Sequence, residues 1–345
     1  MRILVTGAAG FIGTRLSSAL LSRGSLADAS GQQAPVRELI LADRVPPPPP
    51  DDPRVRCVEA DVSDPASVAD LLGEKVDSVF ALAATLTVES ESDFERGLDV
   101  NLRGLLSLLE ACRKRGGMPR MVFPSSLAAF GGPLPETVDD HLQLTPQTSY
   151  GTQKAIGELL VADYSRHRFI DGRCLRLPIV LVRSAGTGPR PSPPPAPTVS
   201  GAIAAIMRDR LAGVDVSCPL APDTRIAAVS LDRVIDGLIT IHDAPTAAFG
   251  HTRSINMPAL SVTLQELADA TDRVASRFGI RAGAMQWATP DERFQSAVEQ
   301  WPRRFVSQAA TALGIHTDAC ADAIVEAYVE AHPELRVSGQ RVSFS

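Results

Sequence analysis

Residues 2–13 read Arg-Ile-Leu-Val-Thr-Gly-Ala-Ala-Gly-Phe-Ile-Gly, and this stretch decides the fold. Residues 2–6 are short and apolar, which predicts a buried strand, and Phe11–Gly24 predicts a helix that ends at its glycine. Between them, Gly7 permits a tight turn, Gly10 lets backbone approach a diphosphate, and Gly13 lets the helix pack on the strand. The free N–H groups and the positive dipole end of that helix favour phosphate groups. The stretch therefore predicts a dinucleotide-binding turn, to which Phe11 and Ile12 also contribute.

Strand-like and helix-like segments alternate after this turn. Predicted strands are Val36–Ala42, Val55–Ala60, Val76–Ala83, Arg120–Pro124 and Arg173–Val182, and predicted helices are Pro65–Leu72, Asp93–Arg115 and Thr148–Arg168. Strands this apolar, alternating with helices, indicate an α/β fold: a doubly wound parallel sheet of the Rossmann type, covered on both faces.

The periodicity weakens after residue 182, which predicts a smaller substrate-binding lobe. We expect residues 1–182 to form the dinucleotide-binding domain and 229–258 to return to it, while 183–228 and 259–345 form the lobe. Within the lobe, the proline-rich residues 189–197 are expected to be a loop. Thr263–Phe278 is expected to be an amphipathic helix with a capping box.

Composition narrows the class of protein. The 345 residues carry 34 basic and 40 acidic side chains, a net charge of −6, which gives no general attraction for nucleic acid or an anionic membrane. No apolar run approaches the length of a membrane span, and the N-terminus does not read as a signal peptide, so a cytoplasmic location is expected. The five cysteines and six histidines are scattered, which predicts reduced thiols and no metal site.

Acidic residues follow two of the predicted strands. Asp43 ends the second strand, where a carboxylate accepts hydrogen bonds from the adenine ribose hydroxyls and repels a 2′-phosphate, so NAD is favoured over NADP. Arg44 follows immediately, and an arginine pairing with that phosphate would partly reverse the preference. Asp61 and Val62, just after the third strand, are placed for the adenine edge, although Asp61 alone reads equally well as a helix cap.

A tyrosine and a lysine lie four residues apart at Tyr150 and Lys154, on one face of a predicted helix. A free phenol is a poor base at neutral pH, but a nearby ammonium favours its ionised form. Ser125 and Ser126 end the fifth strand, at the sheet edge where α/β folds bind ligands. A hydroxyl there is placed to hydrogen-bond a reacting oxygen, although either serine alone reads equally well as a turn residue.

The helix around residues 97–114 carries two apolar stripes. Leu102, Leu106 and Leu109 form one, and the other consists of Leu98, Leu105, Leu108 and Cys112. One stripe covers the sheet, so the second requires another partner. We expect a homodimer through the helices at 94–115 and 148–168. The alternative is that the C-terminal lobe covers the second stripe.

These motifs together resemble the extended short-chain dehydrogenases/reductases, in particular the NAD-dependent epimerase/dehydratase family. The resemblance is carried by the segments 6–13, 61–62, 81–84, 101–104, 124–132 and 150–154. It implies NAD as cofactor, a catalytic Ser126–Tyr150–Lys154 triad, and a lysine that also holds the nicotinamide ribose. It further implies cofactor contacts at Leu82, Ala83, Ala84, Asn101, Pro178 and Val180.

A narrower resemblance, carried by residues 131–136, 144–165, 174–183, 223–225 and 301–305, is to the D-erythronate dehydrogenases. It implies oxidation of the C2 hydroxyl of a small sugar acid by hydride transfer to NAD. On this basis Thr87, Ser126, Arg183 and Arg225 are candidates for substrate contact, the two arginines as partners of a carboxylate. Residues 87–91 and the segment after Arg183 depart from the pattern of those enzymes.

Two other functions stay open at this point. A nucleotide-sugar epimerase or dehydratase would use the same cofactor half but recycle tightly bound NAD within one turnover. A dinucleotide-sensing module without catalysis would not require Ser126, Tyr150 and Lys154. Net release of NADH distinguishes the dehydrogenase from the epimerase.

Overall fold

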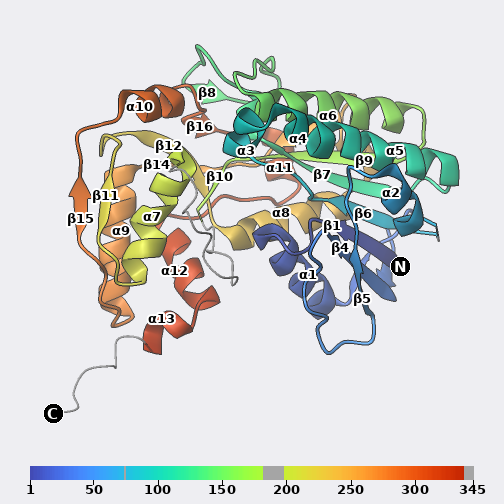
Figure 1. Ribbon diagram of the computed structural model, residues 1–345, viewed down its shortest axis with the longest axis horizontal. Coiled ribbons are helices and arrows are strands. Elements are labelled where there is room, and N and C mark those ends of the chain that lie inside the picture. The colour runs from blue at the N-terminus through green and yellow to red at the C-terminus, as the bar shows by residue number, and fades with distance from the viewer. Residues whose placement is uncertain (74, 182–197, 338–345) are drawn as a thin grey trace.

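The computed structural model describes residues 1–73, 75–181 and 198–337 (Figure 1). Its centre is a sheet of seven parallel strands, confirming the predicted fold class. The order across the sheet is β13 (Ser254–Asn256), β9 (Asp171–Leu177), β7 (Arg120–Ser126), β6 (Ser78–Ala81), β1 (Arg2–Thr6), β4 (Glu38–Asp43) and β5 (Val55–Glu59). The chain runs outward from β1 to β5, then returns to β6 on the other side of β1. Ligands bind at such a switch point, outside the carboxyl ends of the strands.

Helices cover both faces of the sheet (Figure 1). On one face lie α1 (Phe11–Arg23) and α8 (Leu231–Asp243), and on the other α2 (Pro65–Leu71), α5 (Gly104–Arg115) and α6 (Ser149–Arg166). Successive strand residues alternate between the two cores: Ile3 and Val5 pack with the α1 side, and Leu4 with the α5 side. This two-sided burial explains why β1, β4 and β6 consist mainly of apolar residues.

Two predicted elements are interrupted. The helix expected at 93–115 consists of α4 (Phe94–Gly97), a π-helical turn at Leu98–Arg103 and α5, preceded by the unpredicted α3 (Thr87–Ser92). The strand expected at 173–182 ends at Leu177, since Pro178 has no N–H to continue the ladder, and Ile179–Val180 (β10) joins another sheet. The predicted end of the first helix is confirmed, because Gly24 adopts φ +71° there.

Residues 25–35, which interrupt the spacing between the glycine turn and the second strand, form an antiparallel hairpin of β2 (Ser25–Ala27) and β3 (Gln33–Pro35). The Ala27 N–H donates to Asp243 at the end of α8, at 2.8 Å. Buried Arg120 also donates to the Ala27 carbonyl, at 2.7 Å. The hairpin is therefore attached to the sheet beneath it.

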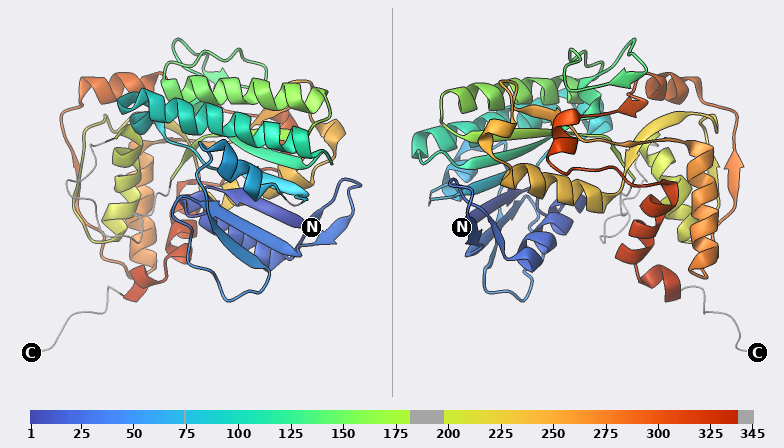
Figure 2. Two further views of the ribbon diagram at one scale, coloured as in Figure 1. Left: turned by 45° about the vertical axis from the view of Figure 1, so that its right-hand side comes forward. Right: turned by 180° about the vertical axis from the view of Figure 1, so that it is seen from behind.

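A second lobe, with its own core, packs beside the sheet (Figure 2). Its helices are α7 (Val199–Leu211), α9 (Leu264–Arg277) and α12 (Ala321–Ala331), and its small sheets are β10–β12 (Arg225–Val229)–β14 (Leu260–Thr263) and β11 (Val216–Cys218)–β15 (Met285–Trp287). The capping box of Thr263 and Glu266 at α9 is present. The smaller elements are the 3₁₀ turns Leu127–Ala129 and Thr246–Ala248, β8 (Thr137–Val138), β16 (Arg304–Phe305), α10 (Glu292–Glu299), α11 (Gln308–Ala312) and α13 (Glu334–Val337).

The division of the chain at residues 182, 229 and 258 stays a prediction. It is supported by β13, which pairs with β9 in the central sheet, and by α8, whose side chains belong to the core beneath that sheet. The proline-rich residues 189–197 lie outside the described residues. None of the helices described here is long and apolar enough to span a membrane.

Candidate active site

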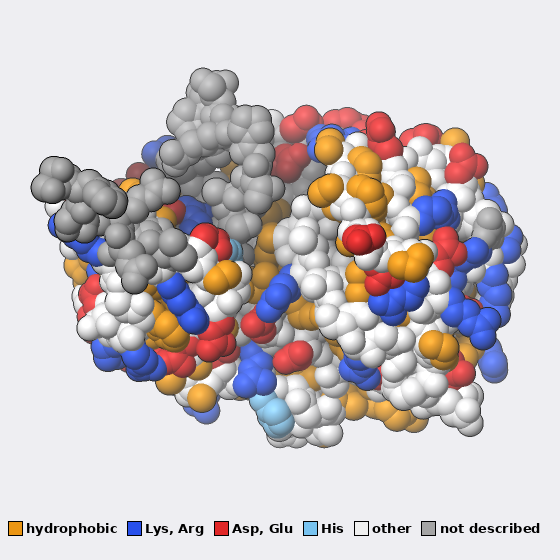
Figure 3. All heavy atoms as spheres, turned by 90° about the horizontal axis from the view of Figure 1, so that it is seen from below, with side chains coloured by type: hydrophobic (Ala, Val, Ile, Leu, Met, Phe, Trp, Pro, Cys, Tyr) orange, Lys and Arg blue, Asp and Glu red, His pale blue; other side chains and the backbone are white. Residues whose placement is uncertain are grey.

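A cavity of about 760 Å³ opens between the carboxyl edge of the sheet and the second lobe. Figure 3 shows a groove between the two parts of the molecule, with hydrophobic side chains inside it. The loops after β1, β4, β5, β6 and β7 form the wall on the sheet side. The second lobe contributes Thr198, Ser200, Ala297, Gln300 and Trp301. The cavity therefore lies at the switch point where this topology places a ligand.

The glycine turn is shaped by close backbone contacts. Gly7 has φ +69°, and a Cβ there would lie 2.7 Å from the Ala83 nitrogen, while a Cβ on Gly13 would collide with the Gly7 carbonyl. A Cβ on Gly10 would approach only the Gly7 carbonyl, at 3.2 Å. Gly10, Phe11 and Ile12 line the cavity at the start of α1. The turn thus presents bare backbone and a helix N-terminus, which fits a diphosphate.

Acidic side chains lie along the same wall, at the ends of β4 and β5. The Asp43 Oδ2 atom accepts a hydrogen bond from the Ala9 N–H at 3.0 Å, which fixes this carboxylate beside the glycine turn. Asp61 accepts from Ser63 and pairs with Arg96 at 3.4 Å. Burial acts to raise the pKa of Asp61, but the hydrogen bonds from Ser63 and the Arg96 charge lower it below its usual value. Arg44 and Val62 also line the cavity.

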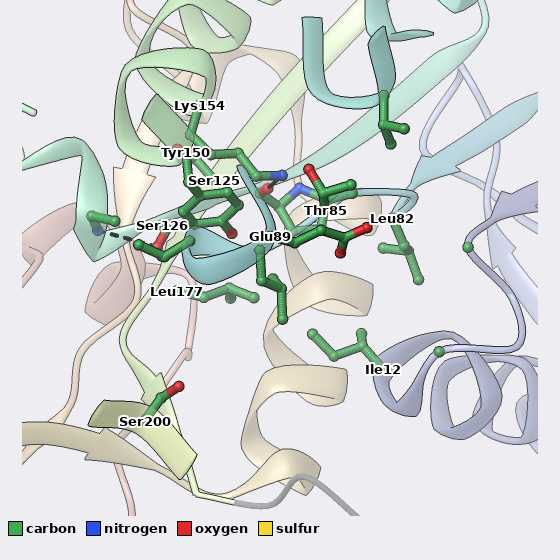
Figure 4. A pocket seen from close by; sticks show the side chains of 18 of the residues that line it. Ile12, Leu82, Thr85, Glu89, Ser125, Ser126, Tyr150, Lys154, Leu177 and Ser200 are labelled. Carbon is green, nitrogen blue, oxygen red and sulfur yellow. Dashed lines mark hydrogen bonds between the residues drawn. The ribbon is translucent and has the colours of Figure 1, made fainter. Parts of the chain in front are cut away.

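The serine, tyrosine and lysine come together on the opposite wall. Figure 4 shows Ser126, Tyr150 and Lys154 grouped there, with Ile12 and Leu82 across the cavity. The Ser126 Oγ atom accepts from the Ala128 N–H at 3.1 Å, so its own O–H remains available as a donor. All three residues line the cavity.

Lys154 is buried against β7. Its Nζ atom donates to the Pro124 carbonyl at 2.9 Å and lies 4.5 Å from the centre of the Phe123 ring and 5.7 Å from that of Tyr150. Burial lowers the pKa of Lys154 to about 8, against the opposing influence of Cys174 and Glu158. The ammonium form therefore still prevails at neutral pH.

The first turn of α6, which carries Tyr150, is held at three points. The Thr148 hydroxyl caps the Gly151 N–H at 3.0 Å, and Glu91 of α3 accepts from the Ser149 N–H at 2.6 Å. At Gly151 any Cβ would collide with the Ala128 carbonyl, so the helix start lies directly against the chain that follows Ser126.

Asn101 is buried in the π-helical turn and does not line this cavity. Its side chain accepts from the Thr85 N–H at 2.9 Å and donates to the Thr85 carbonyl and to Gln153 of α6, the latter at 2.7 Å. Instead of facing the cavity as expected for a cofactor contact, Asn101 joins the loop after β6 to the helix of Tyr150 and Lys154.

The remaining predicted contacts divide into three groups. Leu82, Ala83, Ala84, Thr87, Pro178 and Val180 all line the cavity. Arg225 does not, since its side chain on β12 donates to the Ser261 carbonyl at 3.3 Å and lies 3.9 Å from Glu266. Its predicted contact with substrate has no counterpart in this arrangement. Arg183 lies outside the described residues.

Sequence reasoning missed Thr85, which lines the cavity, and three buried polar residues behind this wall: Gln153, Glu158 and Arg176. Two signals were present in the sequence. Glu158 continues the spacing of Tyr150 and Lys154 by one further helical turn, and Arg176 interrupts an apolar strand, where an unpaired charge would be costly.

Comparison with known proteins gives consistent results. Residues 3–221 match the model of the NAD dependent epimerase/dehydratase family. A D-erythronate dehydrogenase of Cupriavidus necator is 41% identical over 330 residues, covering 96% of this chain and 98% of the relative. One of Haemophilus influenzae is 34% identical, covering 96% and 99%. Among solved structures, a nucleoside-diphosphate-sugar epimerase from Agrobacterium tumefaciens has a TM-score of 0.86 and 32% identity, covering 97% and 95%.

Proposed function

Since this chain belongs to the NAD-dependent epimerase/dehydratase family, we propose that it is a dehydrogenase that oxidises the C2 hydroxyl of a small sugar acid such as D-erythronate, with NAD as the acceptor. The observation that carries this proposal is the grouping of Ser126, Tyr150 and Lys154 on one wall of the cavity, opposite the glycine turn. The two D-erythronate dehydrogenases that this chain resembles over nearly its whole length support the choice of substrate.

The glycine turn, Asp43 and Asp61 are the residues that would hold NAD, whose nicotinamide accepts a hydride from the substrate carbon. Tyr150 takes the proton of the substrate hydroxyl as its general base. The Lys154 ammonium, held on the Pro124 carbonyl, favours the ionised phenol. Ser126 donates its O–H to the same substrate oxygen and so fixes the position of the reacting carbon.

The residues that the second lobe contributes to the cavity favour a small polyhydroxylated substrate. Its described contribution to the cavity includes Thr198, Ser200 and Gln300, which are neutral hydrogen-bonding groups suited to hydroxyls and a carboxylate. Figure 4 shows Ser200 across the cavity from Ser126 and Tyr150. Among the described lining residues, the cations other than Lys154 are Arg44 and Arg96, which lie on the wall of Asp43 and Asp61.

The experiment that tests this function is a panel of four- to six-carbon aldonates and nucleotide-sugars, each incubated with NAD while NADH absorbance is recorded. We expect net NADH with a four-carbon aldonate.

The variant Tyr150→Phe should still bind NAD, but its turnover should be at least about 100-fold slower, because the proton acceptor is lost. Full activity of Tyr150→Phe would contradict the proposed base.

The alternative is a nucleotide-sugar epimerase, favoured by the similarity to the Agrobacterium tumefaciens structure. An epimerase returns the hydride to its product, so it converts a nucleotide-sugar without accumulating NADH. That outcome in the same panel would replace the dehydrogenase with the epimerase.

We also propose a homodimer formed through α5 and α6, which run side by side on one outer face (Figure 2). Leu105, Leu108 and Cys112 face the sheet, so this predicted stripe is the covered one, and Leu109 is buried with them. Leu106 is 39% exposed and Leu159 on α6 is 69% exposed, an apolar surface that suits a second copy. The cytoplasmic location stays a prediction.

A further inference from the structure

A buried ion pair lies behind the wall of Tyr150 and Lys154. Arg176 of β9 donates through Nε to both oxygens of Glu158, at 2.9 and 3.0 Å, and through Nη2 to Oε2 at 2.7 Å. The two side chains are 5% and 4% exposed. Ser125 donates its hydroxyl to the same carboxylate at 2.5 Å. Four hydrogen bonds thus converge on the carboxylate of one glutamate.

Arg176 connects this pair to the rest of the molecule. Its Nη1 atom donates to Asn256 of β13 at 3.1 Å, and its guanidinium lies 5.3 Å from the centre of the Phe130 ring. Phe130 in turn lines the cavity. The pair is therefore fixed by three strands of the sheet and supports the cavity from behind.

Glu158 joins the two elements that carry the reacting groups. It lies on α6, one turn after Lys154 and two turns after Tyr150, and Ser125 directly precedes Ser126 at the end of β7. Between Lys154 and Glu158, α6 packs closely on β7, since a Cβ on Gly157 would lie 2.8 Å from the Phe123 ring. A displacement of either element would separate Ser126 from the other two residues.

We propose that Glu158 is a positioning residue for the reaction, which rests on the proposed roles of Ser126, Tyr150 and Lys154. Its carboxylate clamps α6 to the end of β7 through Ser125, and it places a buried acidic group one helical turn from Lys154.

Few ionisable groups act on Lys154 in the part of the chain that the structure describes. Tyr150 precedes it on the same helix. Cys174 of β9 opposes the lowering of the Lys154 pKa only as a thiolate, and because burial raises the pKa of this thiol well above its usual value, it carries no charge near pH 8. Glu158 supplies a carboxylate, which is itself paired with Arg176. Replacing Glu158 by glutamine should therefore destabilise the charged lysine.

The sequence allows a direct test, because the chain contains only three lysines: Lys75, Lys114 and Lys154. Protein labelled with ¹³C at lysine Cε gives one resonance for each, and Lys154→Arg identifies that of Lys154. In the wild type the Lys154 resonance should titrate with a midpoint near the pKa of about 8. In Glu158→Gln the midpoint should fall by at least about half a pH unit, with kcat reduced about tenfold or more and the Kd for NAD changed less than threefold.

Two further variants separate the clamp from the charge. Ser125→Ala removes only the hydrogen bond from Ser125 of β7 to Glu158 of α6, so we expect a several-fold lower kcat with an unchanged Lys154 midpoint. Asp171→Asn is the matched control, because Asp171 is a buried, arginine-paired carboxylate at the other end of β9. It should reduce stability without moving the Lys154 midpoint.

The proposal is overturned if Glu158→Gln leaves the Lys154 midpoint in place, or lowers kcat no more than Asp171→Asn does. An unchanged kcat in Ser125→Ala would show that the link between Glu158 and Ser125 does not contribute to turnover, which contradicts the proposed clamp. Should Glu158→Gln fail to fold, Glu158→Asp takes its place, and it must keep the wild-type midpoint because it keeps the charge. The Lys154 resonance is measured without turnover. Failure of this inference can therefore be told apart from failure of the proposed function, in which the wild-type protein would oxidise no sugar acid.

Discussion

At the scale of single residues, Asp43 is the side chain that we expect to set the choice of cofactor. Its carboxylate is aimed by one hydrogen bond from the Ala9 N–H, at the end of β4 and beside the glycine turn. A carboxylate in that position accepts from ribose hydroxyls and repels a 2′-phosphate. The exposed Arg44 beside it would instead attract the 2′-phosphate of NADP.

We expect Asp43→Asn to lower kcat/KM for NAD about tenfold and to affect NADP less, because the amide keeps its shape and loses the charge. Initial rates with each cofactor measure the ratio. Arg44→Ala serves as the control, and its preference for NAD should be retained or increased. An unchanged cofactor ratio in Asp43→Asn would mean that the Arg44 side chain, not the carboxylate, decides the choice.

At the scale of elements, α8 is joined to the sheet and to the inserted hairpin by a buried chain of hydrogen bonds. The Asp243 carboxylate accepts from His242 Nδ1 at 2.8 Å, and His242 Nε2 then accepts from the Ser78 hydroxyl of β6 at 2.8 Å. The imidazole also stacks on Phe80, with ring centres 5.3 Å apart. Serine, histidine and aspartate in this order suggest a nucleophile, but Ser78 and His242 are fully buried, so their role is structural.

This chain of bonds predicts how stability depends on pH. Burial lowers the pKa of His242, although Asp243 opposes this effect. The unfolded chain therefore binds a proton near pH 6.5 that the folded protein does not. The free energy of unfolding should fall as the pH drops below about 6.5, by up to about 1.4 kcal/mol per pH unit.

Denaturant titrations between pH 5 and 7.5 measure this dependence. His242→Gln should flatten it, and His251→Gln, on an exposed turn, should leave it as in the wild type. The pKa of Asp243 is also lowered, despite burial acting to raise it, because it accepts from His242. Its contribution is lost only as the pH falls below its ordinary range near 3.8, outside this window. Equal slopes in both variants would contradict the assignment to His242.

At the scale of the whole molecule, the exposed apolar surface of Leu106 on α5 and Leu159 on α6 predicts a homodimer. A charge at Leu159 or Leu106 would be buried without a partner in the proposed dimer, so Leu106→Glu/Leu159→Glu should sediment as a monomer at micromolar concentration. The control is Val214→Glu, which charges a 55% exposed valine of the second lobe and should leave the dimer intact. A monomeric wild type would exclude the interface.

Local spacing in the sequence was sufficient to predict the parallel sheet, the dinucleotide turn and the pairing of Tyr150 with Lys154. These features depend on residues within a few turns of one another, and the steric demands of Gly7 and Gly13 leave their neighbours little freedom. The capping box at Thr263 was predictable for the same reason. The breaks in the long helix and at Pro178 lay at positions that the apolar pattern alone did not mark.

The tertiary structure decided what is brought together from distant segments. Glu158 and Arg176 are 18 residues apart, and Ser78 and His242 are 164 apart. Their pairing depends on which strands are neighbours and not on any local pattern. In the same way, only the fold shows that Arg225 lies away from the cavity and that Asn101 lies behind its wall. The sequence by itself determined the fold class and the candidate reacting groups, because period and spacing are local. The Glu158–Arg176 pair behind those groups and the cavity wall formed by the second lobe depend on how the whole chain packs, so only the tertiary structure revealed them.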